Sequence, residues 1–256
     1  MASAKLSTKP LNRLYVPDPL KAGDELRLDE ERTRYVGRVL RLRVGDAVVL
    51  FDGSGGEFSA AITEVAKRAV VVRVGERRER SVESPLAITL IQGISRGERM
   101  DIVVQKATEL GVRRITPVMT EFSVVRLHGG NDDKGEKRAL HWLKVARSAC
   151  EQCGRNVVPT FDAPQSFKSW LESSSSSGVP RIVLHPGATR TLGNLERIHD
   201  RIELLIGPEG GLSDAEVDQA VAAGFRACSI GPRVLRTETA AIAAIAALQA
   251  RWGDLG

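Results

Sequence analysis

Short hydrophobic runs separated by turn residues fill the first third of the chain and predict β-strands. The runs lie around Leu11–Val16, Glu25–Leu28, Ala47–Phe51, Glu57–Val65 and Ala69–Val74. Gly45-Asp46 and Asp52-Gly53 supply turn signals between some of them. Many short strands at close spacing predict a small β-barrel over residues 1–82, of which about the first ten form a disordered leader or tail.

One segment in this part of the chain has a helical pattern instead. Arg34, Arg38 and Arg41 recur at helical spacing, and no acidic residue interrupts them. They form either an ordinary solvated helix face or a phosphate-binding face, which Arg13 and Arg43 would extend.

From Leu86 onward, strand-like hydrophobic runs alternate with helical stretches. LAITLIQGI is typical of a strand, and GERMDIVVQKATELG is typical of a helix that ends at Gly111. Further helices are predicted over Arg138–Glu151 and from near Ser213 and Thr237. The alternation predicts an α/β domain with a mainly parallel sheet over residues 83–256.

Composition excludes some classes of protein and leaves others open. The formal net charge is only +5, so charge alone proves nothing about nucleic acid. No apolar run approaches the roughly 20 residues that span a bilayer, and the first residues lack the apolar stretch of a signal peptide. We therefore expect a cytoplasmic protein without a membrane partner. Cys150 and Cys153 form a C-x-x-C pair, but Cys228 stands alone, which favours a structural role over a zinc or redox site.

The last three predicted strands end in loops of similar character. These loops are Leu184–Gly187, Ile206–Gly211 and Ile230–Arg233, and each contains glycine and proline. Ligands of open α/β sheets bind outside the carboxyl ends of the strands, where glycine lets the backbone approach a ligand closely. Neither a dinucleotide fingerprint nor a P-loop is present, and the four histidines lack metal-ligand spacing. His185, beside a proline, is interpreted as a loop-shaping residue.

Several motifs taken together resemble one family of enzymes. LLIGPEGGLSDAE is followed by GPRVLRTETAAIAAIAALQ, and RLYV, VLRLRVGD, SRGERMDIVVQKATELGV and ACEQCGRN lie upstream. The chain resembles the RsmE family, the 16S ribosomal RNA uracil-N3 methyltransferases of the SPOUT class, from about Asn12 to Gly256. The resemblance implies a PUA-like RNA-binding barrel, a C-terminal SPOUT domain with a deep trefoil knot, and a homodimer built around a final helix, Thr237–Trp252.

The same resemblance implies a site for S-adenosylmethionine, and arginines are the candidates for a surface that binds RNA. The cofactor-binding candidates are Leu184, His185, Ile206, Gly207, Pro208, Glu209, Gly210, Gly211, Ile230, Gly231, Val234, Leu235 and Thr237, and the RNA-binding candidates are Arg13, Arg34, Arg38, Arg41, Arg43 and Arg96. One position departs from the family. Relatives often carry a charged residue after the His-Pro pair, where this chain has Gly187, with Arg190 nearby.

The chemistry of the reaction suggests catalytic candidates. Uracil N3 is a poor nucleophile until its proton leaves, so an enzyme must lower its pKa or supply a base. Arg236 is the first candidate for stabilising the uracil anion, and an ion pair with Glu209 or Glu238 is the alternative role for it. Glu238 is a candidate base, although a glutamate in the first turn of a helix also interacts favourably with the helix dipole.

Two other functions remain open at this point. A ribose 2′-oxygen methyltransferase of the same class would share the cofactor loops, and a non-catalytic RNA-binding protein could keep the knotted domain as a scaffold. The sequence does not tell which nucleotide is modified, nor whether the substrate is free ribosomal RNA or the assembled small subunit. It assigns no metal site.

Overall fold

The computed structural model describes residues 11–124, 133–174, 178–196 and 200–256. The predicted leader or tail at residues 1–10, together with His128 and His199, lies outside these ranges. The chain divides into two compact units. The first runs to Val82 and includes Cys150–Val157, and the second comprises Glu83–Ala149 and Val158–Gly256.

The first unit is built on a five-stranded sheet in the order β1-β3-β4-β5-β2. β1 and β3 are parallel and the other neighbours are antiparallel. Alternate residues such as Val70, Val72 and Val74 are buried, as expected for strands with one face on a core. The elements are β1 (Asn12–Tyr15), β2 (Glu25–Arg27), α1 (Glu30–Arg34), η1 (Tyr35–Leu40), β3 (Ala47–Phe51), β4 (Glu57–Ala66) and β5 (Ala69–Arg78).

The arginine segment is not one regular helix. α1 ends at Arg34, η1 is a π-helix, and Arg41 follows it in the left-handed conformation with φ of 54°. The three arginines are exposed, but Arg34 is paired with Glu30, and the prediction that they share one α-helical face is wrong. The π-helical turn could not be expected from a spacing that fits an α-helix.

A segment distant in sequence completes the first unit. Arg13 donates to Glu57, to the side chain of Asn156 and to the carbonyl of Arg155, and its side chain is only 10% exposed. The backbone N–H of Tyr15 donates to Glu151 (2.9 Å). The expected boundary near residue 82 therefore leaves out a segment that returns to the barrel. Arg13 is a structural residue here, not part of an exposed arginine patch.

The second unit contains a seven-stranded sheet in the order β12-β10-β11-β6-β7-β8, with β9 also pairing β7. All of its strand pairs are parallel, which confirms the predicted parallel sheet. Its elements are β6 (Ala87–Gly93), α2 (Glu98–Glu109), β7 (Arg114–Met119), α3 (Asp133–Cys153), β8 (Thr160–Phe161), β9 (Gln165–Ser166), α4 (Phe167–Ser173), β10 (Arg181–Leu184), η2 (Leu192–Asn194), β11 (Arg201–Ile206), α5 (Asp214–Ala222), β12 (Arg226–Cys228) and α6 (Thr237–Trp252).

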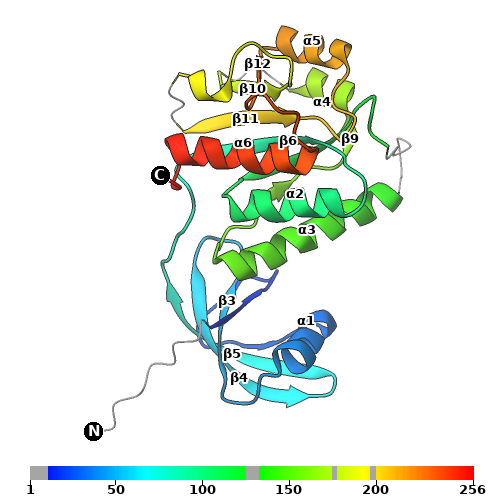
Figure 1. The fold of residues 1–256 in the computed structure, drawn as a ribbon. Coiled ribbons are helices and arrows are strands. Elements are labelled where there is room, and N and C mark those ends of the chain that lie inside the picture. Colours follow the sequence, from blue (N-terminus) through cyan, green and yellow to red (C-terminus); the bar gives the residue numbers. More distant parts are fainter. Residues whose placement is uncertain (1–10, 125–132, 175–177, 197–199) are drawn as a thin grey trace. The chain divides into compact units, whose positions relative to one another are not determined.

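Helices cover both faces of this sheet. Figure 1 shows α2, α3 and α6 on one side of the strands and α4 and α5 on the other. Ile88 and Leu90 of β6 belong to the core under α2 and α6, whereas Ile91 belongs to the core with α4 and α5. A strand buried on both faces reads as a continuous hydrophobic run, as LAITLI does. Within the described ranges, no helix combines the length and the apolar character that spanning a bilayer requires.

Candidate functional site

The last three strands of the parallel sheet end side by side. In the register of β10 with β12, Leu184 lies opposite Cys228, and Val183 of β10 lies opposite Leu205 of β11. The loops that follow the three strands therefore meet at one edge of the sheet. This is the arrangement expected from their sequences.

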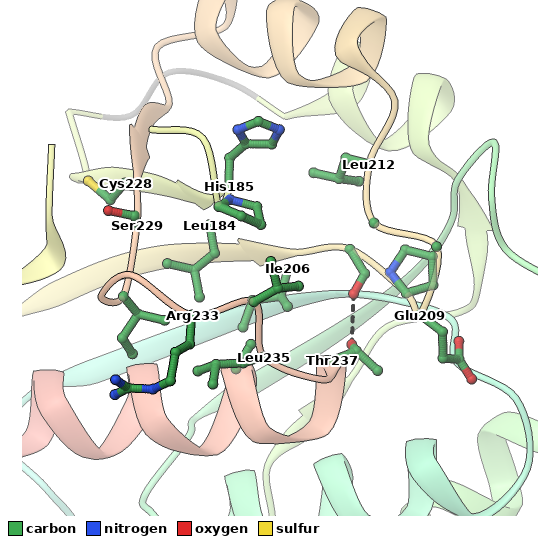
Figure 2. Close-up of a pocket in the computed structure, with 18 of the residues that line it drawn as sticks. Leu184, His185, Ile206, Glu209, Leu212, Cys228, Ser229, Arg233, Leu235 and Thr237 are labelled. Carbon is green, nitrogen blue, oxygen red and sulfur yellow. Dashed lines mark hydrogen bonds between the residues drawn. The ribbon is translucent and has the colours of Figure 1, made fainter. Parts of the chain in front are cut away.

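These loops enclose a cavity of about 310 Å³, shown in Figure 2. All thirteen residues predicted to bind the cofactor line it. The cavity walls also include Ala240 of α6 and residues that were not among the predicted cofactor candidates, namely Pro186, Leu212, Cys228, Ser229 and Arg233. Pro186 and Arg233 belong to two of the predicted loops. The volume lies at the lower end of the range for small-molecule sites, roughly 300–1,000 Å³.

Buried contacts fix the position of the central loop. The Thr237 hydroxyl donates to the carbonyl oxygen of Gly207 (2.7 Å), the bond drawn in Figure 2. The fully buried Gln92 side chain donates to the Gly207 carbonyl (3.3 Å) and to Thr237 Oγ1 (3.1 Å). Gln92 was not predicted, although a polar residue at the end of an apolar strand is a signal that could have found it.

Glycine at position 93 is required by the close approach of this loop. A Cβ atom on Gly93 would lie 2.4 Å from Pro208 Cδ and 2.5 Å from its nitrogen. Any side chain there would displace the loop from Gly207 to Gly211, so the end of β6 sets the depth of the cavity.

The loop after β12 leaves its backbone donors available. Several backbone N–H groups of this loop form no hydrogen bond within the described residues, namely those of Ile230, Gly231 and residues 233–236. Such groups at a cavity wall can bind the polar edges of a ligand, while Leu184, Ile206 and Leu235 provide apolar surface.

Charged groups stand at the two ends of the cavity. Figure 2 shows Glu209 and Arg233 on opposite sides of it. Glu209 accepts hydrogen bonds from the backbone N–H of Arg96 (2.9 Å) and the guanidinium of Arg99 (2.9 Å). Burial raises the pKa of Glu209, but these two donors outweigh it and leave the pKa below its usual range. Glu209 is therefore ionised at neutral pH and is a weak base.

The two predicted catalytic residues lie beside the cavity and do not line it. Arg236 is exposed at the N-cap of α6, and in the described ranges it forms no ion pair. Its predicted alternative role, an ion pair with Glu209, is wrong because Arg99 occupies that carboxylate. Glu238 lies in the first turn of α6, and its Oε2 is buried without a hydrogen-bond partner in the described structure.

The remaining polar residues of the loops have structural contacts. His185 Nδ1 accepts a hydrogen bond from the backbone N–H of Gly187 (3.2 Å), which fits the predicted loop-shaping role. Arg190, considered as a replacement for the charge absent at Gly187, does not line the cavity. Burial raises the pKa of the Cys228 thiol, which keeps it protonated and a poor nucleophile. The described residues contain no cluster of potential metal ligands.

The cysteine pair and the other predicted arginines lie elsewhere. Cys150 is buried, and its Sγ donates to the carbonyl of Val157 (3.7 Å). Arg38, Arg41 and Arg43 are exposed on the first unit, and Arg96 is exposed at the start of α2 in the second unit.

Comparison with known proteins gives two matches to family models. Residues 82–249 match an RNA methyltransferase domain, and residues 28–75 match an RNA methyltransferase PUA domain. The first match covers most of the α/β unit and the second lies in the unit built on the five-stranded sheet.

Relatives of similar length share this organisation. Ribosomal RNA small subunit methyltransferase E of Buchnera aphidicola subsp. Acyrthosiphon pisum is 34% identical over 98% of each chain, and the Bacillus subtilis protein of the same name is 29% identical over 85% of this chain and 87% of its own. Among solved structures, a putative methyltransferase from Legionella pneumophila in complex with the cofactor SAM has a TM-score of 0.91 and 41% identity, over 96% of this chain and all of that one. Ribosomal RNA small subunit methyltransferase E from Neisseria gonorrhoeae bound to S-adenosyl methionine has a TM-score of 0.88 and 37% identity over the same shares.

Proposed function

Because the chain belongs to the family of ribosomal RNA small subunit methyltransferase E, an α/β RNA methyltransferase domain with a PUA-like domain, we propose that it methylates 16S ribosomal RNA with S-adenosylmethionine as donor. We propose N3 of a uridine as the methyl acceptor and the cytoplasm as the place of reaction. The observation that carries the proposal is the single cavity that the three carboxyl-end loops form in a chain so similar to cofactor-bound enzymes.

The residues of the cavity fit S-adenosylmethionine. The unbonded N–H groups from Ile230 to Arg236 suit the polar edge of an adenine, and Leu184, Ile206 and Leu235 suit its ring faces. The ionised Glu209 offers an acceptor at the cavity mouth. The bound cofactor would supply an electrophilic methyl group on a positively charged sulfur.

The protein must deliver uracil as its N3 anion. A cation near the base lowers the pKa of N3–H, and the exposed Arg236 and the cavity residue Arg233 are the nearby guanidinium groups that can do so. Since Cys228 stays protonated and the lowered pKa of Glu209 makes it a weak base, positioning and electrostatics are the main contributions of this chain to transfer. We retain Glu238 as the candidate base because its buried Oε2 lacks a partner in the described structure.

The chain path around the cavity supports a knot in this domain. After β12, the backbone of Ser229 is bonded on both sides to the loop that follows β10, through Arg190 O and Leu192 N (2.8 and 2.9 Å). The chain then returns to α6, which contacts β11 and α2. We propose that it does so through the loops, as a deep trefoil knot.

We further propose a homodimer built around α6. Its buried residues Ala241, Ala244 and Ile245 face its own core, and small residues such as Ala243 and Ala246 on other faces permit close approach of a second chain. Light scattering at micromolar concentration tests this, and a monomeric mass would exclude it.

Ala240→Phe tests the cofactor site. The bulky ring would project from α6 into the cavity without straining the helix, whereas a residue at Gly210 would meet Phe122 Cβ at 2.6 Å and disturb packing. We expect S-adenosylmethionine binding, measured by calorimetry, to be lost, with Ala222→Phe at an exposed position of α5 as control.

The reaction itself is tested with labelled S-adenosylmethionine and ribosomal RNA from cells that lack the protein. Label is expected on N3 of one uridine of 16S RNA. Label on a ribose 2′-oxygen, or no transfer by a protein that binds the cofactor, would overturn the proposed reaction.

A further inference from the structure

A second cavity lies beside the start of α2. Its volume is about 650 Å³, and its walls come from the β6–α2 connection and from α3. Arg96, Arg138 and His141 are its basic residues, and Asp101 is its carboxylate. This cavity is separate from the cofactor loops, and no step proposed so far uses it.

The charge of this lining is positive. Asp101 Oδ2 lies 2.8 Å from His141 Nε2, so the carboxylate is already engaged. In the part of the chain that the structure describes, the guanidinium groups of Arg96 and Arg138 have no carboxylate partner within 4.0 Å. Among the lining residues that the structure describes, two arginines against one aspartate give a net positive charge whether or not His141 is protonated.

The helix that forms one wall extends the basic character. Lys137, His141 and Lys144 are exposed and follow one another at i, i+4 and i+7 on α3. Residues at this spacing share a helix face. A polyanion that enters the cavity would therefore meet more positive charge along the same face.

One residue connects the second cavity with the cofactor site. Arg96 lines the second cavity, and its backbone N–H donates to Glu209 Oε1 (2.9 Å), while Glu209 lines the first cavity. An RNA strand could thus place one nucleotide at the methyl donor and the adjacent nucleotide at Arg96.

We infer that the second cavity binds a backbone phosphate of the RNA next to the target nucleotide, through Arg96 and Arg138. This inference rests on the proposed function of the cofactor site. A phosphate is the ligand indicated, rather than a stacked base, because the aromatic residue of the lining, Trp142, is only 4% exposed and offers little ring surface. Guanidinium groups bind phosphate oxygens with charge-assisted hydrogen bonds.

The phosphate contact would position the substrate. A uridine can reach the donor only when its Watson–Crick edge is unpaired or turned out of the stack. Holding the neighbouring phosphate fixes the backbone from which the base is turned out. The methyltransferase domain would then bind RNA itself, close to the reacting base.

Arg96→Ala and Arg138→Ala test the inference, with Arg201→Ala as the matched control. Arg201 is 71% exposed at the amino end of β11, whereas the cofactor loop follows the carboxyl end of that strand. Initial rates are measured with unmodified 16S RNA over a range of salt concentrations. We expect each cavity variant to raise the KM for RNA about tenfold, as loss of a charged hydrogen bond predicts. Each should also flatten the slope of log KM against log salt by about one unit.

Further measurements separate a phosphate contact from a structural effect. In the cavity variants, S-adenosylmethionine affinity and kcat should stay within about twofold of the wild type. Arg138→Lys should have a KM for RNA close to that of the wild type, because lysine keeps the positive charge. Arg138→Gln, which keeps the three-carbon stem of the side chain without its charge, replaces the alanine variant if that variant has a lowered melting temperature. An unchanged KM and salt slope in the Arg96 and Arg138 variants of an active enzyme would overturn the inference. An inactive wild-type enzyme would instead overturn the proposed function.

Discussion

At the scale of single residues, arginine has several distinct roles in this chain. Arg13 is enclosed by Glu57, Asn156 and the Arg155 carbonyl, and Arg99 holds Glu209 at the cofactor cavity. Arg38 is exposed. Sequence spacing placed Arg13 and Arg38 in one patch, because charge is visible in a sequence and the partner that neutralises it is not.

Arg13→Ala is expected to lower the free energy of unfolding by about 3 kcal/mol, since it leaves a buried carboxylate without its main partner. Burial raises the pKa of Glu57, but the hydrogen bonds and charges of Arg13 and Arg80 outweigh it, so the folded pKa lies below the unfolded value. Glu57 thus stabilises the fold above the ordinary glutamate pKa, and this contribution is lost as the pH falls through the lowered pKa. Urea denaturation at pH 7 and pH 3 should show that the free energy of unfolding falls less between the two pH values in Arg13→Ala than in the wild type.

Arg38→Ala is the control for that experiment. Its side chain is exposed, so the free energy of unfolding should change by no more than about 0.5 kcal/mol at either pH. Equal effects of the two substitutions would contradict a structural role for Arg13.

Gly93→Ala is expected to weaken S-adenosylmethionine binding more than tenfold and to cost about 2 kcal/mol of stability, because the new Cβ would overlap Pro208. Calorimetry and thermal melting measure the two effects. Gly37→Ala is the matched control, since a Cβ there meets nothing within 4 Å and the backbone is not left-handed. Normal cofactor affinity in Gly93→Ala would show that the loop can shift at no cost to binding.

At the scale of elements, the sequence predicted helix ends correctly where the residues that determine them are neighbours in the chain. α5 begins after Ser213, near the predicted start, with a capping box of Ser213 and Glu216. α2 is followed by Gly111, where its end was predicted, and Gly111 is in a left-handed conformation. α4 was not predicted, because it begins directly after a two-residue strand and next to a serine run that is typical of a loop. The π-helical η1 was mistaken for an α-helix because the i, i+4 and i+7 spacing of the three arginines matches the α-helical period.

Ser213→Ala should lower the free energy of unfolding by about 1 kcal/mol through loss of the cap. Glu216→Ala should cost more, about 2 kcal/mol, because Glu216 Oε2 accepts from Ser213 N–H and Oε1 from the backbone N–H of Glu121 (2.9 Å). Denaturation curves give both values. If Glu216→Ala were no more costly than Ser213→Ala, the bond to Glu121 would contribute nothing to stability.

At the scale of the whole molecule, the sequence predicted the parallel sheet and the loops of the cofactor cavity, since both follow from strand ends. It did not predict that Cys150–Val157 returns to the first unit, because that return depends on tertiary contacts of Arg13 and Tyr15. Gln92 and Gly93 were missed for the same reason. Their roles depend on Gly207 and Pro208, more than a hundred residues away in sequence.

Two groups of arginines in separate units now share the proposed task of holding RNA. If Arg38 and Arg41 on the first unit contact phosphates, Arg38→Ala with Arg41→Ala should raise the KM for 16S RNA about a hundredfold and leave S-adenosylmethionine affinity intact. Ala at position 41 keeps a Cβ in the same left-handed conformation as the arginine, so the comparison isolates the lost charge.

Combining this pair with Arg138→Ala shows whether the two units bind RNA independently. Arg138 lies on α3 in the second unit, and substitutions at sites that share no partners have additive effects. The increases in log KM should therefore add, and each lost arginine should reduce the salt slope by about one unit. A normal KM at every salt concentration in the Arg38 and Arg41 variant would make these two arginines ordinary solvated surface. RNA would then be bound by the second cavity and the basic face of α3 beside it.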